Sequence, residues 1–268
     1  MFSVVAGPDG EQRRERLQRS GPRWFADDRP IRRVHGDASM LIGGLRALLL
    51  QSLHPLAMAG VAQHSGYKGD PWGRVQRTSH FIAVTTYGTA DDAEAMVRGI
   101  RGIHDRVRGT ARDGRPYAAS DPHLLSWVHL AGVDSFLAAY QRFGDRPLDP
   151  DEQDGYVADT ALVARKLGVL DPPLTVQEVR EQLAQFRPEL RSTPEARETA
   201  RFILLAPPLS LLARGPYGVL GAAAVSLLPA WARWPLRVPY LPVTEAVAVR
   251  AAGQVVTRTI RWAMAPDQ

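Results

Sequence analysis

The segment 36–61 reads GDASMLIGGLRALLLQSLHPLAMAGV, and it decides the fold class. From Met40 onward it is apolar almost all round, which is typical of a helix buried inside a helical protein. Asp37 and Ser39 are good N-cap residues for this helix, and Pro55 should kink or divide it. An arginine, a glutamine, a histidine and the proline interrupt the apolar run. We therefore expect a central core helix rather than a membrane span.

Outside this segment the apolar residues recur with helical spacing, and no stretch alternates convincingly with the period of a strand. Caps, glycines and prolines bound further predicted helices near 72–87, 89–109, 120–140, 151–167, 175–186, 194–205 and 243–264. The helix near 89–109 places Met96, Val97, Ile100, Ile103 and Val107 on one face. The sequence therefore predicts an all-α fold with a single globular multi-helix domain over residues 34–268. Residues 1–33, polar and rich in arginine, are predicted to be an N-terminal arm.

The tail of the chain is apolar but broken. Prolines, glycines and an arginine divide Ile203–Trp231 into pieces that are shorter than a membrane span. We favour a broken helical hairpin inside the core, with a surface that dips into a membrane as the alternative.

Composition excludes several classes of protein. The 268 residues contain no cysteine, which removes disulfides, thiolate metal sites, iron–sulfur clusters and haem held by thiolate. Of the 33 basic residues only two are lysines, and the arginines are spread along the chain, so we expect no nucleic-acid partner. No apolar run of signal-peptide length occurs near the N-terminus, so the expected location is the cytoplasm, with peripheral membrane contact left open.

The histidines are the candidates for chemistry, because the common hydrolase, nucleotide-binding and di-iron motifs are absent. His104 lies on the predicted apolar face of its helix, one residue after Ile103. A buried imidazole must satisfy both ring nitrogens, and one of them could bind iron. A hydrogen-bonded core histidine is the alternative reading of this pattern.

Arg74 and Thr78 are four residues apart on one predicted helix, so both point from one face. An arginine and a hydroxyl arranged in this way could hold haem propionates, although a solvated arginine beside a helical threonine is equally common.

The order of several short motifs resembles one family. The motifs are Gly36-Asp37, His54-Pro55, His64-Ser65, Arg74-x-x-Arg77-Thr78, Ile103-His104-x-x-Val107-x-Gly109, Tyr117-x-Ala119-x-Asp121-Pro122 and Trp127-Val128-His129. In this order and spacing, over about residues 30–245, the chain resembles the DUF2236 family, which includes the MpaB-type oxygenases and the latex-clearing rubber oxygenases.

The resemblance implies a mostly helical, globin-like haem protein. The family's proximal haem ligand falls on His104, which makes His104 the predicted metal ligand. The haem-pocket arginine and threonine fall on Arg74 and Thr78. Two departures set this chain apart from the rubber oxygenases. Arg77 stands where they have a distal lysine, and Met40–Val61 contains no carboxylate to match their glutamate base.

Three functional hypotheses follow. The first is a haem b oxygenase that uses dioxygen and an unidentified electron donor on an apolar, unsaturated small molecule, with His54, His64 or Arg77 as distal donor. The second is a non-catalytic haem sensor or carrier, with His54, His64 or His129 as second ligand. The third is a helical hydrolase or binding module without a cofactor, for which the sequence offers no nucleophile–base pair.

Overall fold

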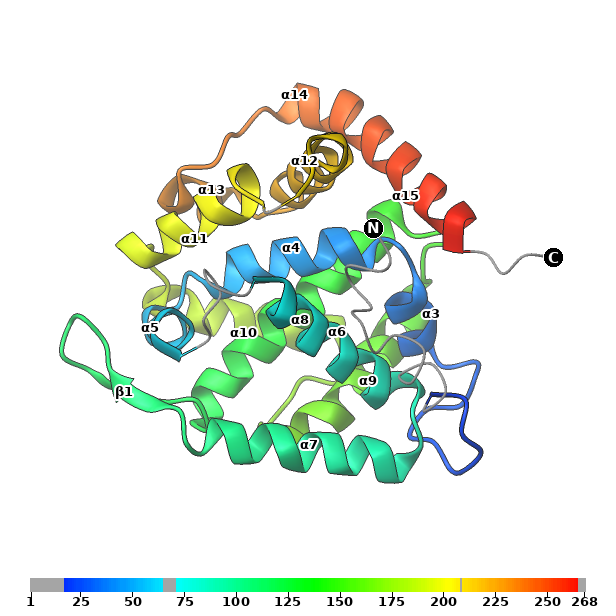
Figure 1. Ribbon diagram of the computed structural model, residues 1–268, viewed down its shortest axis with the longest axis vertical. Coiled ribbons are helices and arrows are strands. Elements are labelled where there is room, and N and C mark those ends of the chain that lie inside the picture. The colour runs from blue at the N-terminus through cyan, green and yellow to red at the C-terminus, as the bar shows by residue number, and fades with distance from the viewer. Residues whose placement is uncertain (1–16, 65–70, 208, 265–268) are drawn as a thin grey trace.

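The computed structural model describes residues 17–64, 71–207 and 209–264 (Figure 1). Nearly all regular structure in these residues is helical, which confirms the predicted all-α single domain. The elements are α3 (Pro30–Gly36), α4 (Met40–Gln51), α5 (Pro55–His64), α6 (Pro71–Tyr87), α7 (Ala90–His104), β1 (Arg108–Thr110), β2 (Pro116–Ala118), α8 (Pro122–Phe143), α9 (Pro150–Leu167), α10 (Val176–Phe186), η1 (Arg187–Glu189), α11 (Pro194–Leu205), α12 (Leu211–Ser226), α13 (Ala230–Leu236), α14 (Pro242–Thr244), η2 (Glu245–Val249) and α15 (Arg250–Met264). Of the predicted N-terminal arm, residues 1–16 lie outside the described residues. Its last residues begin α3, where Ile31 is buried.

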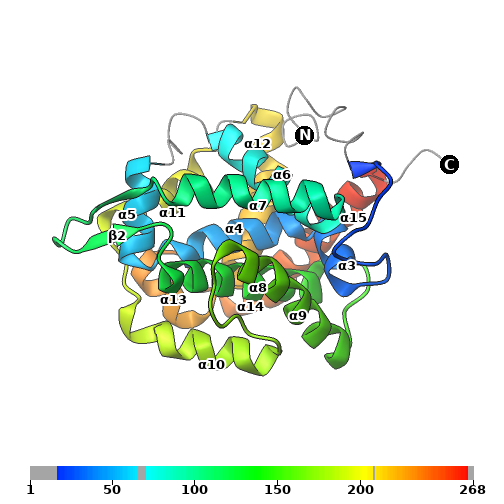
Figure 2. The same cartoon turned by 90° about the horizontal axis from the view of Figure 1, so that it is seen from below.

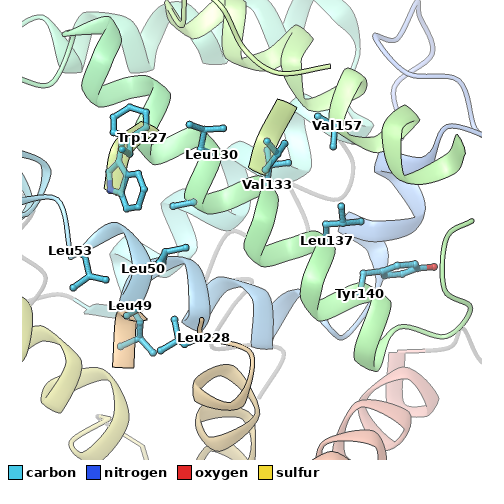
Figure 3. Packing of buried hydrophobic residues seen from close by; sticks show 14 of the residues in the cluster. Leu49, Leu50, Leu53, Trp127, Leu130, Val133, Leu137, Tyr140, Val157 and Leu228 are labelled. Carbon is cyan, nitrogen blue, oxygen red and sulfur yellow. The ribbon is translucent and has the colours of Figure 1, made fainter. Parts of the chain in front are cut away.

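Helix α4 lies at the centre of the fold and packs along α8 (Figure 3). Leu49, Leu50 and Leu53 meet Trp127 and Leu130 in one cluster from which water is almost completely excluded. Each buried leucine of this kind contributes roughly 1.5–3 kcal/mol to folding. The apolar character of α4 on all sides is explained by this position, because α12 packs against it from the other direction.

The predicted division at Pro55 is confirmed. Helix α4 ends at Gln51, and α5 begins at Pro55 in a direction turned by 108°. Proline lacks an N–H, so carbonyls at the end of α4 lose their helical partners. The indole N–H of Trp127 donates to Gln51 O over 3.1 Å, and the backbone N–H of Arg191 donates to Leu53 O over 2.9 Å. The corner is therefore built from groups that come from distant parts of the chain.

Helix α7 contacts α6 on one side and α9 on the other (Figure 2). It begins as predicted, because Thr89 accepts a hydrogen bond from the backbone N–H of Asp92 and donates to its carboxylate. It ends at His104, five residues before the predicted end. The prediction that Val97 and Ile103 share one buried face of α7 was wrong in part. Val97 is buried, whereas Ile103 is 48% exposed.

The reason for the early end is a small hairpin that the sequence did not predict. β1 and β2 pair antiparallel, with Gly109 opposite Tyr117. The connecting turn contains Gly114 at φ +83°, a conformation that glycine adopts without strain. Strands of three residues are too short to show a period of two, so pattern analysis had no signal to detect.

Helices α11 to α15 form a layer that covers α4 on the side away from α7 (Figure 1). Two of the predicted breaks in Ile203–Trp231 occur, between α11 and α12 and between α12 and α13. The break expected at the glycines and proline of 214–218 does not, because α12 continues through Pro216. Among the described residues no single helix is long and apolar enough to cross a membrane. Only the bent pair α4 and α5 meets the length and composition criteria together.

Candidate functional site

A cavity of about 360 Å³ lies between α6 and α7. It is lined by Leu17, His80, Val84, Gly88, Asp92, Ala95, Met96, Gly99, Ile100 and Ile103. The lining residues of α6 recur every fourth position, so they occupy one face of the helix. All of the lining is apolar or glycine except His80 and Asp92. A space of this size and character suits an apolar ligand.

His104 ends α7 next to Ile103 of the cavity lining. Its Nδ1 atom is buried and has no hydrogen-bond partner among the described residues. Burial lowers the pKa of His104 below its usual value, and the charge of Asp105 opposes this only in part. The imidazole is therefore neutral at pH 7, which is the form that binds metals. An unsatisfied buried nitrogen costs about 1–3 kcal/mol, a cost that a bound ligand removes.

His129 in α8 also has a buried ring nitrogen without a hydrogen-bond partner in the part of the chain that the structure describes. Its Nε2 atom is buried without a partner, and burial lowers its pKa to about 4. Among the described residues only four buried side-chain nitrogen or oxygen atoms lack a partner, and the other two belong to Arg32 and Ser39. Two of the four are thus imidazole nitrogens in segments that carry the motifs of the sequence analysis.

The three predicted pocket residues of α6 do not line the cavity. Arg74 is half-buried, and Arg77 and Thr78 are exposed. At about 100° per residue, Arg77 lies on the same side of α6 as His80, whereas Thr78 lies about 200° from it. The helix therefore brings Arg77 to the rim of the cavity face and directs Thr78 away from it.

His64 lies at the exposed end of α5 beside the hairpin. Its Nε2 is 3.1 Å from the hydroxyl of Tyr117, which itself donates to Gln63 Oε1 over 2.7 Å. His64 is thus fixed against Tyr117 of β2 rather than against the cavity lining.

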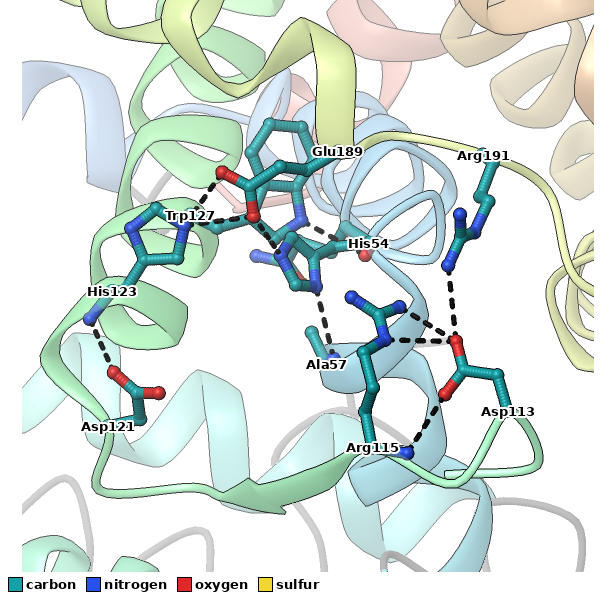
Figure 4. Close-up of polar contacts among 10 residues, drawn as sticks. His54, Ala57, Asp113, Arg115, Asp121, His123, Trp127, Glu189 and Arg191 are labelled. Atoms are coloured by element: carbon teal, nitrogen blue, oxygen red, sulfur yellow. Dashed lines mark hydrogen bonds and ion pairs between the residues drawn. The ribbon is translucent and has the colours of Figure 1, made fainter. Parts of the chain in front are cut away.

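His54 lies in a second cluster, at the corner between α4 and α5 (Figure 4). Its Nε2 is 3.3 Å from Oε2 of Glu189, and Nε2 of His123 is 2.9 and 3.0 Å from the two carboxylate oxygens of Glu189. Burial lowers the pKa of His54, which the hydrogen bond to Glu189 offsets only in part. Burial alone would raise the pKa of Glu189, but the hydrogen bonds with His123 and His54 outweigh it, so this pKa is lowered.

His80, His123 and Glu189 were not predicted from the sequence as members of a site. His80 had a usable signal, because His80, Val84 and Gly88 repeat every four residues opposite a second periodic face on α7. No sequence signal pointed to Glu189, because its contact with His54 joins residues that are 135 positions apart in the chain.

Comparison with known proteins places the chain in a family. Residues 32–262 match the family described as ER-bound oxygenase mpaB/B'/Rubber oxygenase, catalytic domain. The uncharacterized proteins Mb2261 of Mycobacterium bovis and Rv2237 of Mycobacterium tuberculosis are each 33% identical over 99 residues, which is 37% of this chain and 36% of the relative. The matched region therefore covers about a third of the length of these relatives. No solved structure matches the chain. Because the family match extends from α3 to α15, the protein belongs to the MpaB and rubber oxygenase catalytic-domain family.

Proposed function

We propose that this protein is a haem b oxygenase that uses dioxygen to oxidise an apolar, unsaturated small molecule. The observation that carries the proposal is the unpartnered, buried nitrogen of His104, at the end of a helix that lines an apolar cavity through other residues, in a chain of an oxygenase family. The absence of cysteine excludes attachment of the haem through thioether bonds and ligation of its iron by thiolate.

Of the proposed haem residues, His104 carries an unsatisfied group that a haem would complete, whereas Arg74 and Thr78 are proposed from the resemblance. Neutral His104 supplies an imidazole for the iron, and its burial keeps the competing proton away at neutral pH. Arg74 and Thr78 are the proposed partners of the propionates, where a guanidinium forms strong charge-assisted hydrogen bonds. Bound haem supplies the site at which dioxygen binds and is activated.

The rest of the chain selects and orients the substrate. Val84, Met96 and Ile100 offer an apolar wall that excludes water and favours a hydrocarbon chain over a polar molecule. Arg77 is the proposed distal donor, because both ring nitrogens of His54 already have partners and Nε2 of His64 faces the hydroxyl of Tyr117. Cleavage of a C=C bond by dioxygen needs no external reductant, whereas insertion of a single oxygen atom requires the unidentified electron donor.

A non-catalytic haem carrier or sensor is the second candidate. His129 favours it, because its unpartnered Nε2 is a potential second iron ligand. A six-coordinate ferrous state that excludes carbon monoxide would support this function over the oxygenase.

The decisive experiment is absorption spectroscopy of the protein expressed with adequate haem supply. We expect a Soret band in the wild type that is lost or shifted in His104→Ala, and a carbon monoxide difference spectrum for the reduced wild type. His123→Ala is the control, because His123 belongs to the other cluster and should leave the spectrum unchanged. A colourless wild type, or equal haem content in wild type and His104→Ala, would overturn the assignment of His104.

A further inference from the structure

The cluster of His54, His123 and Glu189 joins three parts of the fold that are distant in sequence. His54 lies at the α4–α5 corner, His123 in the first turn of α8, and Glu189 at the end of η1 (Figure 4). One donor atom from each residue lies within 4.8 Å of the other two. Two imidazoles and one carboxylate are a ligand set used by zinc and by non-haem iron sites that keep a position open.

The spacing of the donor atoms suits a small ion. Ligand atoms held 2.0–2.1 Å from a tetrahedral zinc are about 3.3 Å from one another. The Nε2–carboxylate distances here are 2.9, 3.0 and 3.3 Å, so only small side-chain movements are needed to admit the ion.

The ligands are held in place by packing. The ring of His123 stacks on Phe186 with centroids 4.6 Å apart, and the ring of His54 meets Phe186 edge-on at 6.4 Å. Trp127 packs beside both rings, with its centroid 6.3 Å from that of His54 and 5.4 Å from that of Phe186. Ordered rings lose little entropy when they bind a metal ion, which favours affinity.

Solvent reaches the cluster on the side of His123 and Glu189. His54 is buried, whereas the side chains of His123 and Glu189 are 53% and 41% exposed. Water can therefore complete the coordination shell from that side. The guanidinium of Arg115, whose charge acts on His54, is bound to Asp113 over 2.8 and 3.0 Å, which reduces its repulsion of a cation.

One feature opposes metal binding. The N–H of Ala57 donates to Nδ1 of His54 over 3.4 Å, so the neutral ring carries its proton on Nε2. An ion at Nε2 moves this proton to Nδ1 and breaks that hydrogen bond, which is already long.

We propose that His54, His123 and Glu189 bind one divalent transition-metal ion of the zinc class, at a site separate from the proposed haem. The bound ion ties the α4–α5 corner to α8 and η1 and presents an open coordination position to solvent.

The test is a titration of tag-free, chelator-treated full-length protein with ZnCl₂, followed by calorimetry and by the visible spectrum of Co²⁺. We expect one equivalent to bind to the wild type and to raise its Tm. Glu189→Gln and His123→Ala, both at exposed side chains, should weaken binding at least about tenfold. His64→Ala and His104→Ala are controls and should bind as the wild type does.

Absence of saturable binding would show that the three residues form a hydrogen-bonded network only, and would overturn the proposal. Equal affinity in Glu189→Gln and wild type would overturn it as well, because the ion would then lie elsewhere. Neither outcome affects the haem proposal, which rests on His104.

A separate observation concerns the outer surface of the C-terminal layer. Of the fifteen exposed large apolar side chains among the described residues, eleven lie in the segment from Leu205 to Met264. The segment 201–264 contains seven arginines and a single acidic residue, Glu245. Arg233 and Arg261 pair inside the protein, with Glu245 and Asp37, and the other five arginines are exposed.

Helix α15 shows how the two kinds of side chain combine. Its inner face is closed by Gly253 and Thr257 against Phe143. Val255, Arg258 and Trp262 are exposed and follow one another at intervals of three and four residues, so they share the outer face. An exposed tryptophan next to an exposed arginine is typical of a helix that lies in the interface of an anionic bilayer.

We infer that the outer face of the C-terminal layer docks on an anionic membrane surface. The proposal predicts that the protein sediments with vesicles containing phosphatidylglycerol, less with pure phosphatidylcholine, and less at high salt. Trp262→Ser with Val255→Ser should weaken sedimentation, and each of Arg250→Gln and Arg258→Gln should weaken it about fivefold.

Leu170→Ser is the matched control, because Leu170 is equally exposed but lies outside this layer. Absence of vesicle binding would overturn the proposal. If gel filtration instead showed a dimer that Trp262→Ser dissociates, the occupant of this face would be a second copy of the chain.

Discussion

Arg46 of α4 and Asp134 of α8 form an ion pair across the two central helices, with 2.7 Å between Nη2 and the carboxylate. The guanidinium also donates to the hydroxyl of Ser135 over 2.7 Å and to Leu227 O over 3.0 Å. Its partners therefore come from α8 and from the segment after α12. A buried charge is tolerated in this core because its hydrogen-bonding groups are satisfied.

Removal of this arginine should be strongly destabilising. We expect Arg46→Ala to lower the free energy of unfolding by about 3–5 kcal/mol, because Asp134 and two buried acceptors lose their partner. Urea unfolding followed by circular dichroism measures the change. Arg237→Ala, at an exposed arginine, should stay within about 0.5 kcal/mol of the wild type. A loss for Arg46→Ala as small as that would show that the pair does not stabilise the helix contact.

Stability should fall with acid, and His35 should account for part of the fall. Burial lowers the pKa of His35 to about 3, and its ring contacts the hydroxyls of Thr86 and Tyr156. The folded pKa is below the unfolded value of about 6.5, so the unfolded chain takes up the proton first as the pH falls. The stabilisation is complete above pH 6.5 and is lost between pH 6.5 and 3. Between pH 7.5 and 5 the loss is about 2 kcal/mol.

Urea midpoints of wild type and His35→Gln at the two pH values test this contribution. The variant should lose less stability on acidification, whatever its stability at pH 7.5. His129 is unchanged in both proteins, so its own titration cancels in the comparison. Parallel pH profiles would contradict the assignment to His35.

Close packing at the hairpin predicts a large effect of a single methyl group. A Cβ atom at Gly109 would lie 2.5 Å from the hydroxyl of Tyr117 and 3.0 Å from Oε1 of Gln63. Gly109→Ala should therefore displace Tyr117 from its contacts with Gln63 and His64 and cost about 1–3 kcal/mol. Gly44→Ala is the matched control, because a Cβ there meets nothing within 4 Å.

Gly44 lies inside helix α4, where alanine is favoured over glycine, so Gly44→Ala should raise the free energy of unfolding by about 0.5–1 kcal/mol. Thermal unfolding of the two variants should therefore shift in opposite directions. A shift in the same direction would contradict the crowding argument at Gly109.

The cavity can be filled without damage to the core. Gly99 lines it, and a Cβ at this position meets no neighbouring atom within 4 Å. We expect Gly99→Leu to keep or increase stability and to weaken the binding of haem or of an apolar fluorescent probe. Arg98→Leu adds similar apolar surface next to the cavity lining and should leave binding unchanged. Undiminished binding in Gly99→Leu would show that the ligand lies elsewhere.

Local signals in the sequence predicted the local features of this fold. The corner at Pro55 and the cap of α7 at Thr89 depend on neighbouring residues, and both predictions are confirmed. Features that depend on long-range packing were missed or misplaced. Ile103 was expected on the buried apolar face of α7, but it is 48% exposed, because α7 ends one residue later and the chain turns into the β1–β2 hairpin.

In the candidate site, too, some residues were predicted from local sequence signals, and others depend on long-range packing and were missed. His104 was identified from its helix and from the resemblance, and its unpartnered nitrogen agrees with a ligand role that stays a prediction. The contact between His54 and Glu189 could not be predicted, because it depends on the path that the chain takes through the fold after α10.

The corner between α4 and α5 also constrains the order of folding. Its carbonyls are satisfied by Trp127 and Arg191, which follow Gln51 and Leu53 by 76 and 138 residues. During synthesis the most apolar stretch of the chain therefore leaves the ribosome long before the groups that complete its turn. Contacts this distant in sequence form slowly, and an apolar segment that waits for them is open to misassociation. The nascent chain must protect this segment, in a collapsed intermediate or on a chaperone, until residue 191 has emerged.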